Sequence, residues 1–404
     1  MAHSGQMVCE QITERKSVGE TMKKVAFIYL SNYSEWPMGG MLTYVKNIIP
    51  FLSEQDDWKM DLWGGTVNHF KPEPFSCNGH NISINIYTNI KTQNKIVPNF
   101  VRSFFGVLFN RKQFKKYDIV YSHTSATTIA MKIIYPRKYV VHHQHGLSYK
   151  NNKEISRILN LGYTLAQLVA NITFFVASET EVNEHKKNAL FVKKRFYHMG
   201  SPINYKDIIN VPSDKNHKQL NFIYTGRIDK WKNIDLLIDS FLLFSQKYQK
   251  PCKLTLIGDG PEFMRISQKI NQIHAEQMIY LEGCKDFEDI VKELKKSDFF
   301  LFPSKGEGVS LSILEALAAG VPVIAFDVVG VRNLIKNNAT GILVRQMTKE
   351  AFAEGICSAV HNTNLTSEKC IQSVQLYDAE SISKQIFSTI SDEYHLYTIR
   401  ENGL

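Results

Sequence analysis

Several features that would place a protein in a simple class are missing from this sequence of 404 residues. Its six cysteines lie far apart and form no C-x-x-C pair, which argues against a zinc ribbon and a disulfide framework and favours a reducing compartment. Residues 1–22 hold no apolar segment of a signal peptide, so we expect a disordered tail there. The chain also has no internal repeat and no low-complexity tract.

Long hydrophobic runs are missing too. The longest stretch without a charged residue covers residues 161–177, which is about the minimum length of a membrane span. Its character changes midway, from a helical pattern over 161–170 to β-branched and aromatic residues over 172–177. We therefore expect a helix that runs into a buried strand, and no transmembrane segment. From these absences we expect a cytoplasmic protein.

Positive charge is in excess, with a formal net charge of +9. In the first half it gathers around the apolar run 104–109, at Lys91, Lys95, Arg102, Arg111, Lys112, Lys115 and Lys116. One interpretation is a patch that makes peripheral contact with the anionic inner face of the cytoplasmic membrane; the other is a solvated basic face beside a core helix. No nucleic-acid motif accompanies the charge, so we expect no nucleic-acid partner.

What the sequence does contain is an alternation of short apolar runs and amphipathic segments. Strands that are apolar on both faces and alternate with helices predict parallel sheets covered on both sides. The expected strands are residues 25–30, 118–122, 139–143 and 174–178 in the first half, and 221–225, 253–257, 278–281, 298–303 and 322–326 in the second. The expected helices include 41–54, 233–247, 261–273 and 286–296.

The α/β pattern breaks once, over the proline- and polar-rich residues 202–218. We therefore predict two doubly wound, Rossmann-like domains facing a central cleft, over residues 23–203 and 220–378, joined by a linker over 204–219. A last helix within 379–404 either closes the second domain or packs back on the first. Ligands of such sheets bind outside the carboxyl ends of the strands.

The most informative motif follows the predicted strand 298–303. Gly306 and Gly308 form a loop whose backbone can approach a ligand closely, and a helix expected from about Val309 directs free N–H groups at that loop, which suits a phosphate. Glu315 on this helix could accept hydrogen bonds from ribose hydroxyls, and Glu307 in the loop could face a sugar. A lone glutamate is usually a surface residue, but these two are framed by a strand, a glycine loop and an apolar helix.

The E-x7-E spacing of Glu307 and Glu315, followed by Ala-Leu-Ala-Ala-Gly-Val-Pro-Val, resembles retaining glycosyltransferases of family 4, of the bacterial surface-polysaccharide type. These enzymes have the GT-B fold. The resemblance extends more weakly from about Lys24 to the C-terminus. It implies an N-terminal acceptor domain, a C-terminal nucleotide-sugar donor domain, and transfer with retention at the anomeric carbon.

Other positions in the second half agree with this resemblance. Arg227 and Lys232, after the strand 221–225, match the pair that clamps the donor diphosphate in similar enzymes. The alternative is a strand-end arginine and a solvated lysine. Backbone at four loop and turn glycines is expected near the nucleotide, although turn chemistry alone would explain them: Gly226, Gly258, Gly260 and Gly283. The phosphate cradle implied is Gly308, Val309, Ser310 and Leu311.

In the first half, Gly39 and Gly40 resemble the glycine loop that approaches donor and acceptor. His145 matches the cleft histidine that contacts the transferred sugar. His142 and His143 are expected to alternate between core and surface. A metal site is conceivable here, but no full ligand set is evident, GT-B enzymes use no catalytic metal, and no D-x-D occurs in the chain, so we expect no cofactor.

The resemblance thus implies a retaining hexosyltransferase that moves a sugar from a nucleotide sugar, expected to be a UDP-sugar, to a glycan or lipid-linked acceptor in lipopolysaccharide, O-antigen or capsule synthesis. Arg227, Lys232, Glu307 and His145 would carry the reaction. Val309 and Ser310 depart from the family's commoner aromatic and glycine. Other classes stay open: a GT-B UDP-sugar epimerase, an inactive nucleotide-sugar-binding homologue and, less in keeping with the charged motif, a basic nucleic-acid binder.

Overall fold

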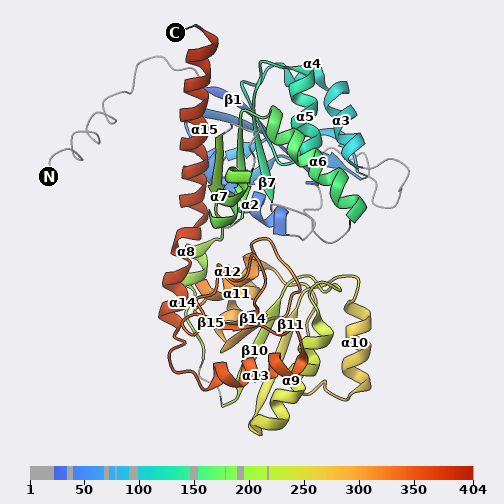
Figure 1. Ribbon diagram of the computed structural model, residues 1–404, viewed down its shortest axis with the longest axis vertical. Coiled ribbons are helices and arrows are strands. Elements are labelled where there is room, and N and C mark those ends of the chain that lie inside the picture. Colours follow the sequence, from blue (N-terminus) through green and yellow to red (C-terminus); the bar gives the residue numbers. More distant parts are fainter. Residues whose placement is uncertain are drawn as a thin grey trace, which may run out of the picture.

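The computed structural model describes residues 22–33, 40–67, 72–77, 80–90, 99–145, 153–177, 179–188, 195–215 and 218–403. Two α/β domains lie one above the other, each with a sheet covered by helices, and a long C-terminal helix runs along one side (Figure 1). The expected N-terminal tail and Gly39 lie outside the described residues.

The N-terminal domain is built on a parallel sheet of seven strands in the order β5-β2-β1-β6-β7-β8-β9. The central strands β6 and β8 are buried along their whole length, which explains their apolar sequences. The strands are β1 (Lys23–Asn32), β2 (Trp58–Thr66), β5 (Ile84–Asn89), β6 (Ile119–Ser122), β7 (Tyr139–His145), β8 (Ile172–Val176) and β9 (Arg195–Met199). The helices are α2 (Gly40–Ser53), α3 (Asn99–Phe109), α4 (Arg111–Phe114), α5 (Ser125–Ile134), α6 (Lys153–Val169) and α7 (Glu179–Asn188), and a small antiparallel ladder pairs β3 (Phe75–Cys77) with β4 (His80–Ile82).

The C-terminal domain has a six-stranded parallel sheet in the order β12-β11-β10-β13-β14-β15. Counted along the domain this is 3-2-1-4-5-6, the order of a doubly wound dinucleotide-binding sheet, whose ligands bind where the order reverses. The strands are β10 (Leu220–Thr225), β11 (Cys252–Ile257), β12 (Ile279–Leu281), β13 (Phe299–Phe302), β14 (Val323–Phe326) and β15 (Gly341–Val344). The helices are α9 (Ile234–Tyr248), α10 (Phe263–Gln272), α11 (Phe287–Lys295), α12 (Leu311–Ala318), α13 (Lys349–Val360) and α14 (Ser367–Ser373). The predicted α/β class with two doubly wound domains is confirmed.

The chain passes between the domains twice, and the two crossings lie side by side. The Ile203 N–H donates to the Tyr377 carbonyl at 2.8 Å, and the Ala379 N–H donates to the Ile203 carbonyl at 2.9 Å. Directly after the first crossing comes α8 (Tyr205–Asn210), within the stretch expected as a linker, and its Ile208 is buried in the C-terminal core.

The last helix, α15 (Ala379–Glu401), belongs to the N-terminal domain in space although it follows the C-terminal domain in sequence (Figure 1). It packs against α2, and Ile382, Ile386 and Ile390 are buried in the same core as β1 and β6. The hydroxyl of Ser383 donates to the Ile48 carbonyl at 3.4 Å. The N-terminal core is therefore completed by the end of the chain.

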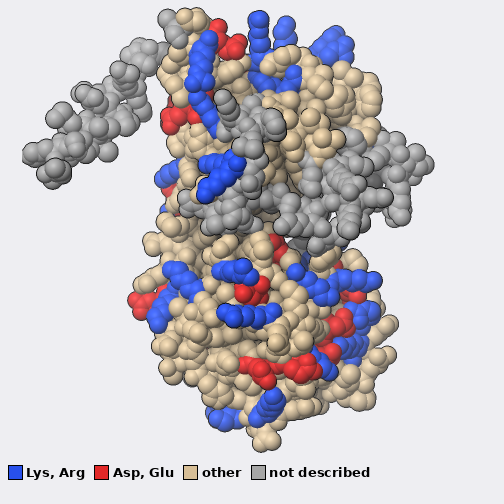
Figure 2. Space-filling view, in the orientation of Figure 1, with Lys and Arg blue, Asp and Glu red and all other residues tan. Residues whose placement is uncertain are grey.

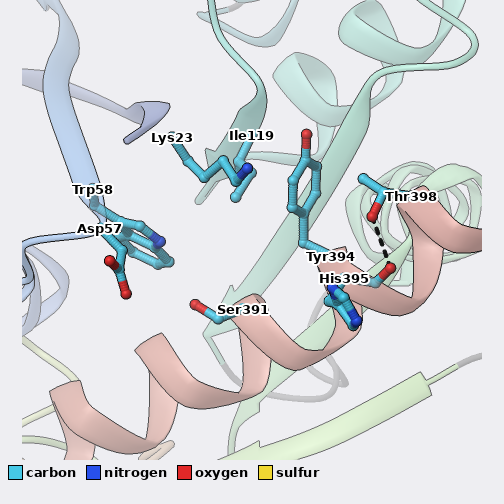
Figure 3. A pocket seen from close by; sticks show the side chains of 8 residues that line it. All are labelled: Lys23, Asp57, Trp58, Ile119, Ser391, Tyr394, His395 and Thr398. Carbon is cyan, nitrogen blue, oxygen red and sulfur yellow. Dashed lines mark hydrogen bonds between the residues drawn. The ribbon is translucent and has the colours of Figure 1, made fainter. Parts of the chain in front are cut away.

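A small cavity of about 90 Å³ lies between α15 and the amino ends of β1 and β6. Figure 3 shows Lys23, Trp58 and Ile119 facing Tyr394 and His395 across it. Because ligands of parallel sheets bind at the opposite, carboxyl ends of the strands, this cavity is distinct from the predicted site.

Arg111 and Lys112 of the basic patch lie on α4, at the pole of the N-terminal domain that points away from the other domain, where Figure 2 shows Lys and Arg side chains gathered; Lys91 and Lys95 of the patch lie outside the described residues. Between Glu73 and Glu154 the sequence has one acidic residue, Asp118. Two phenylalanines of α3 project beside this charge and stack on each other, Phe105 with 47% and Phe109 with 77% of its surface exposed.

Among the described helices, none combines the length and apolar character needed to cross a membrane.

Candidate functional site

The loop that connects β13 to α12 forms the centre of the candidate site. The helix was expected from about Val309, but α12 begins at Leu311, because Ser310 keeps an extended backbone (φ −82°, ψ 114°) and is the N-cap residue. The Ser310 side chain makes no capping bond to the helix; its hydroxyl lies 3.1 Å from that of Ser312. The first N–H groups of α12 are thus left free of a side-chain cap, as an anion site requires.

Lys232 and Glu307 are brought together by the fold, but in the described structure they bind each other. The Lys232 ammonium pairs with a carboxylate oxygen of Glu307, and the Ser304 hydroxyl donates to the same oxygen at 2.6 Å. Both side chains of the pair are mostly buried, with 19% and 17% of their surface exposed. The Lys305 N–H donates to the Trp231 carbonyl at 3.0 Å, which ties the loop to the segment that carries Lys232.

Arg227 lies on the same segment as Lys232, but its side chain is exposed rather than mostly buried. Its side chain is 62% exposed, and its ion pair is with Asp229, at 3.6 Å between Nε and Oδ2. The Arg227 carbonyl accepts a hydrogen bond from the buried Tyr224 hydroxyl at 2.9 Å. The backbone is therefore fixed while the guanidinium remains able to reach a ligand.

The predicted glycines lie where the loops after β10, β11 and β12 touch through their backbones. The Gly258 N–H donates to the Gly283 carbonyl at 2.7 Å. Gly258 has φ +141°, and a Cβ there would overlap the carbonyl of Gly226. A Cβ at Gly260 would overlap the backbone of Ile228. Gly258 and Gly260 need to be glycine because of this close approach, so they shape the floor of the site.

Glu315 lies on α12, and within the described part of the chain its carboxyl group has no hydrogen-bond or ion-pair partner. Burial raises the pKa of this carboxyl to about 7, because the charged form loses its hydration and gains no cation in return. An isolated buried carboxyl is costly unless a ligand pairs with it. The position is thus suited to accept hydrogen bonds from hydroxyls of a bound molecule.

Gly330, after β14, was missed by the sequence reasoning. It has φ +86°, and a Cβ there would overlap the carbonyl oxygens of Gly308 and Glu307. The turn that follows β14 therefore presses directly on the loop that holds Glu307. The sequence around Gly330, Val-Val-Gly-Val, carries no motif that would have shown this.

On the N-terminal side, Gly40 begins α2 and His145 ends β7. His145 is bonded to a residue that the sequence reasoning missed, with 3.0 Å between its Nε2 and the Nδ1 of His123. Burial lowers the pKa of His145 to about 4 and that of His123 well below its usual range, so both rings are neutral at pH 7. His123 follows β6, the strand next to β7, and this adjacency of strand ends was the available signal.

His142 and His143 were expected to alternate between core and surface, and this was wrong: both are fully buried. β7 is a central strand, so helices cover both of its faces. His142 Nδ1 lies 3.0 Å from the hydroxyl of Thr128, while His143 stacks on His123 and His145. No group of His, Cys, Asp and Glu suited to a metal ion occurs among the described residues.

The two halves of the site meet at Val309. Its side chain packs against the C-terminal core and also against the N-terminal core that contains Tyr44. Tyr44 of α2 lies edge-on to the ring of His145, with 4.9 Å between ring centroids. The structure thus links the glycine loop of one domain to the core beside the histidines of the other.

Comparison with known proteins identifies the C-terminal half. Residues 206–376 match the family described as "Glycosyl transferases group 1". An uncharacterized glycosyltransferase of Methanocaldococcus jannaschii is 25% identical over 370 residues, which is 85% of this chain and 91% of that protein. The match spans both domains.

Solved structures of other proteins superpose on both domains of this chain. A sucrose-phosphate synthase of Thermosynechococcus elongatus superposes with a TM-score of 0.74 at 18% identity, covering 93% of this chain and 100% of that one. Anabaena Alr3699/HepE, in complex with UDP, superposes with a TM-score of 0.68 at 19% identity, covering 91% and 100%. These neighbours have the GT-B fold, and the family match supports a glycosyltransferase function.

Proposed function

We propose that this chain, a glycosyltransferase of the GT-B fold with a group 1 domain over residues 206–376, is a retaining hexosyltransferase of family 4 that uses a UDP-sugar. The observation that carries the proposal is that Lys232 pairs with Glu307 in the loop that leads into the uncapped N-terminus of α12, the helix that also carries the unpartnered Glu315 carboxyl. That arrangement provides a cation and a hydroxyl acceptor on the loop and the paired segment, and helix N–H groups with a second hydroxyl acceptor on the helix that follows.

A nucleoside diphosphate sugar matches these groups one by one. The diphosphate would take the N–H groups of α12 together with Arg227 and Lys232, which are two cations beside a helix N-terminus. The ribose hydroxyls would donate to Glu315, and this would supply the partner that its buried carboxyl lacks. Uridine is supported by the structural neighbour from Anabaena, which was solved with UDP.

Donor binding would rearrange the pair of Lys232 and Glu307. A phosphate that attracts the Lys232 ammonium weakens its bond to Glu307, and the released carboxylate can then accept hydrogen bonds from hydroxyls of the sugar. Ser304 would keep the carboxylate oriented. The ion pair thus holds both groups in position before the donor arrives, and it limits the reorganisation needed when the donor binds.

The reaction would follow front-face attack. The acceptor oxygen forms a bond to the anomeric carbon on the side from which the diphosphate leaves, and the acceptor proton passes to an oxygen of the departing phosphate. His145 would contact the transferred sugar, while Arg227 and Lys232 stabilise the charge that develops on the leaving group. No metal or other cofactor is required in this scheme, so we expect chelators to leave activity unchanged.

For the acceptor we propose a glycan or a lipid-linked glycan of lipopolysaccharide, O-antigen or capsule synthesis, made at the inner face of the membrane. Support comes from the basic pole with its exposed Phe105 and Phe109, a combination that favours anionic lipid surfaces. Sedimentation with phosphatidylglycerol vesicles at low salt tests this part. We expect binding that weakens in Phe109→Ser and at high salt; no binding would remove the membrane from the proposal.

The first test of the whole proposal is thermal stability with UDP, GDP, ADP and their sugar conjugates, for the wild type and Glu315→Ala. A ligand at a hundred times its dissociation constant stabilises the protein by about 2.7 kcal/mol. We expect a shift with uridine nucleotides that the variant loses. A shift with another nucleotide would change the donor, and no shift with any of them would contradict the donor site.

Product analysis then separates the alternatives. A transferase forms UDP together with a glycosylated acceptor of retained configuration. A UDP-sugar epimerase would release UDP and an altered sugar without an acceptor, and an inactive homologue would bind the donor and turn nothing over. Either of these results would replace the proposed function.

A further inference from the structure

Four aromatic rings form a compact group at the carboxyl ends of β6 and β7. The rings of His123, His143 and His145 stack nearly parallel, with centroid distances of 4.7 Å (His123–His143), 4.9 Å (His143–His145) and 5.3 Å (His123–His145). Tyr44 of α2 lies edge-on to all three. Because rings packed from several sides cannot turn, the nitrogens of His145 have fixed positions.

The hydrogen bonds of this group determine where the protons are. His123 Nδ1 and His145 Nε2 share one hydrogen bond at 3.0 Å, so one of these nitrogens carries the proton and the other accepts it. The other nitrogen of His123, Nε2, is buried without a partner among the described residues. An orphaned buried N–H is rarer in proteins than an orphaned acceptor.

The rarity of orphaned buried N–H groups favours one of the two possible positions of the proton between His123 and His145. If His145 donated, His123 would have to carry its proton on the orphaned Nε2. If His123 donates from Nδ1, its Nε2 is left as an unpaired acceptor. His145 then accepts at Nε2 and carries its own proton on Nδ1, which, unlike His123 Nε2, is not among the buried unpartnered atoms, because the His145 side chain is only half-buried.

We propose that His123 is a positioning residue that fixes His145 as the Nδ1–H tautomer and so presents a hydrogen-bond donor to the substrate. The inference rests on the proposed function in one respect only, the contact between His145 and the transferred sugar. A fixed donor would bind a sugar hydroxyl through its oxygen. A His145 free to take the other tautomer would offer an acceptor there instead.

The tautomer can be measured without substrate, by ¹⁵N NMR of histidine-labelled protein, with the His145 signals assigned through His145→Gln. We expect the Nδ1–H pattern in the wild type. In His123→Phe, which keeps an aromatic ring for the stack but no nitrogen, we expect His145 to change to the Nε2–H form that free imidazole side chains prefer. An Nε2–H pattern in the wild type, or an unchanged pattern in His123→Phe, would overturn the proposal.

Kinetics supply the second readout. His123→Phe should lower kcat/KM about tenfold, the equivalent of one neutral hydrogen bond. His123→Asn, whose side-chain amide can donate from nearly the position of Nδ1, should restore most of the loss and the wild-type tautomer. Equal loss in both variants with normal folding would show that the ring alone matters and would refute the positioning role. If no donor supports transfer at all, the NMR result still decides the tautomer.

Discussion

The two domains share one class of sheet but present opposite chemistry at the carboxyl ends of their strands. In the N-terminal domain these ends carry stacked histidines held neutral by burial, and a group of cations lies at the far pole. In the C-terminal domain they carry backbone in close contact, an ion pair and an unpaired carboxyl. We therefore expect the C-terminal half to receive charge and the N-terminal half to offer neutral hydrogen bonds.

The two halves should therefore respond to acid differently. The pKa values of His123, His142, His143 and His145 are lowered in the folded protein, so below about pH 6.5 the unfolded chain binds more protons and folding stability falls. Each imidazole that must stay neutral at pH 5 costs on the order of 2 kcal/mol. Hydrogen exchange at pH 7 and pH 5 should show lost protection in β6 and β7, with β10 and β13 as the internal control. Equal loss in both domains would contradict the comparison.

Removing charge from the C-terminal site should affect the rate most. Lys232→Ala removes the mostly buried cation expected to stabilise the leaving diphosphate, and we expect kcat to fall roughly 100- to 1000-fold, or about 3–4 kcal/mol. Steady-state kinetics with a UDP-sugar measure this. Lys230→Ala, an exposed lysine on the same segment, is the matched control and should stay within about twofold. A raised KM with unchanged kcat in Lys232→Ala would mean that the cation serves binding alone.

The backbone contacts of the same site can be broken separately. Gly330→Ala forces a Cβ against the carbonyls of Gly308 and Glu307 at φ +86°, so it should destabilise the C-terminal domain by about 2–3 kcal/mol. Gly306→Ala adds the same atom into open space and should cost under about 1 kcal/mol. Urea unfolding compares the two variants, and equal stabilities would argue against the contact.

Glu315→Gln tests whether the stability of the C-terminal domain depends on pH with the opposite sign to that of the N-terminal domain. The pKa of Glu315 is raised to about 7 in the folded protein, so the folded chain binds more protons than the unfolded chain between the usual value of 4.5 and 7, and stability falls as pH rises through this window. In the Glu315→Gln variant the side chain is neutral at every pH. The variant should be more stable than the wild type by on the order of 3 kcal/mol at about pH 8 and equal to it at about pH 4. A constant difference across this range would show that the carboxyl is not buried alone.

Val309→Ala tests the point where the halves touch and should have the smallest effect. The side chain packs against both cores, so its loss weakens contact between the glycine loop and the N-terminal domain at a cost of about 1 kcal/mol. We expect a several-fold increase in the KM of the donor with kcat nearly unchanged. Leu311→Ala, whose side chain packs against the C-terminal core, separates this effect from general loosening of the loop.

Much of the fold could be predicted because both sheets consist of short apolar strands between helices. The missed strands of the two large sheets have weaker signals: β2 contains Lys59 and Asp61, β9 contains Arg195 and His198, and both β5 and β15 lie at sheet edges. The start of α12 was placed two residues early because the extended backbone of Ser310 has no mark in the sequence.

The candidate residues of the C-terminal domain were easier to find in the sequence than those of the N-terminal domain for a physical reason. Glu307, Glu315 and the neighbouring glycines lie within one loop and helix, so their spacing along the chain is fixed by local geometry. His123 and His145 come from two strands that meet only in the folded sheet, and Gly330 reaches its neighbours across the site. Such pairs have no fixed spacing that a motif could record.

Because the two crossings at Ile203 and Ala379 lie side by side, the N-terminal domain consists of two separate parts of the chain. Residues 22–203 produced alone would leave uncovered the apolar side chains against which Ile382, Ile386 and Ile390 pack, and we expect such a fragment to aggregate. Because the Ala379 N–H bonds directly to the Ile203 carbonyl, a loop of a few residues could join position 203 to position 379. The result would be a self-sufficient N-terminal domain obtained by deleting the middle of the polypeptide.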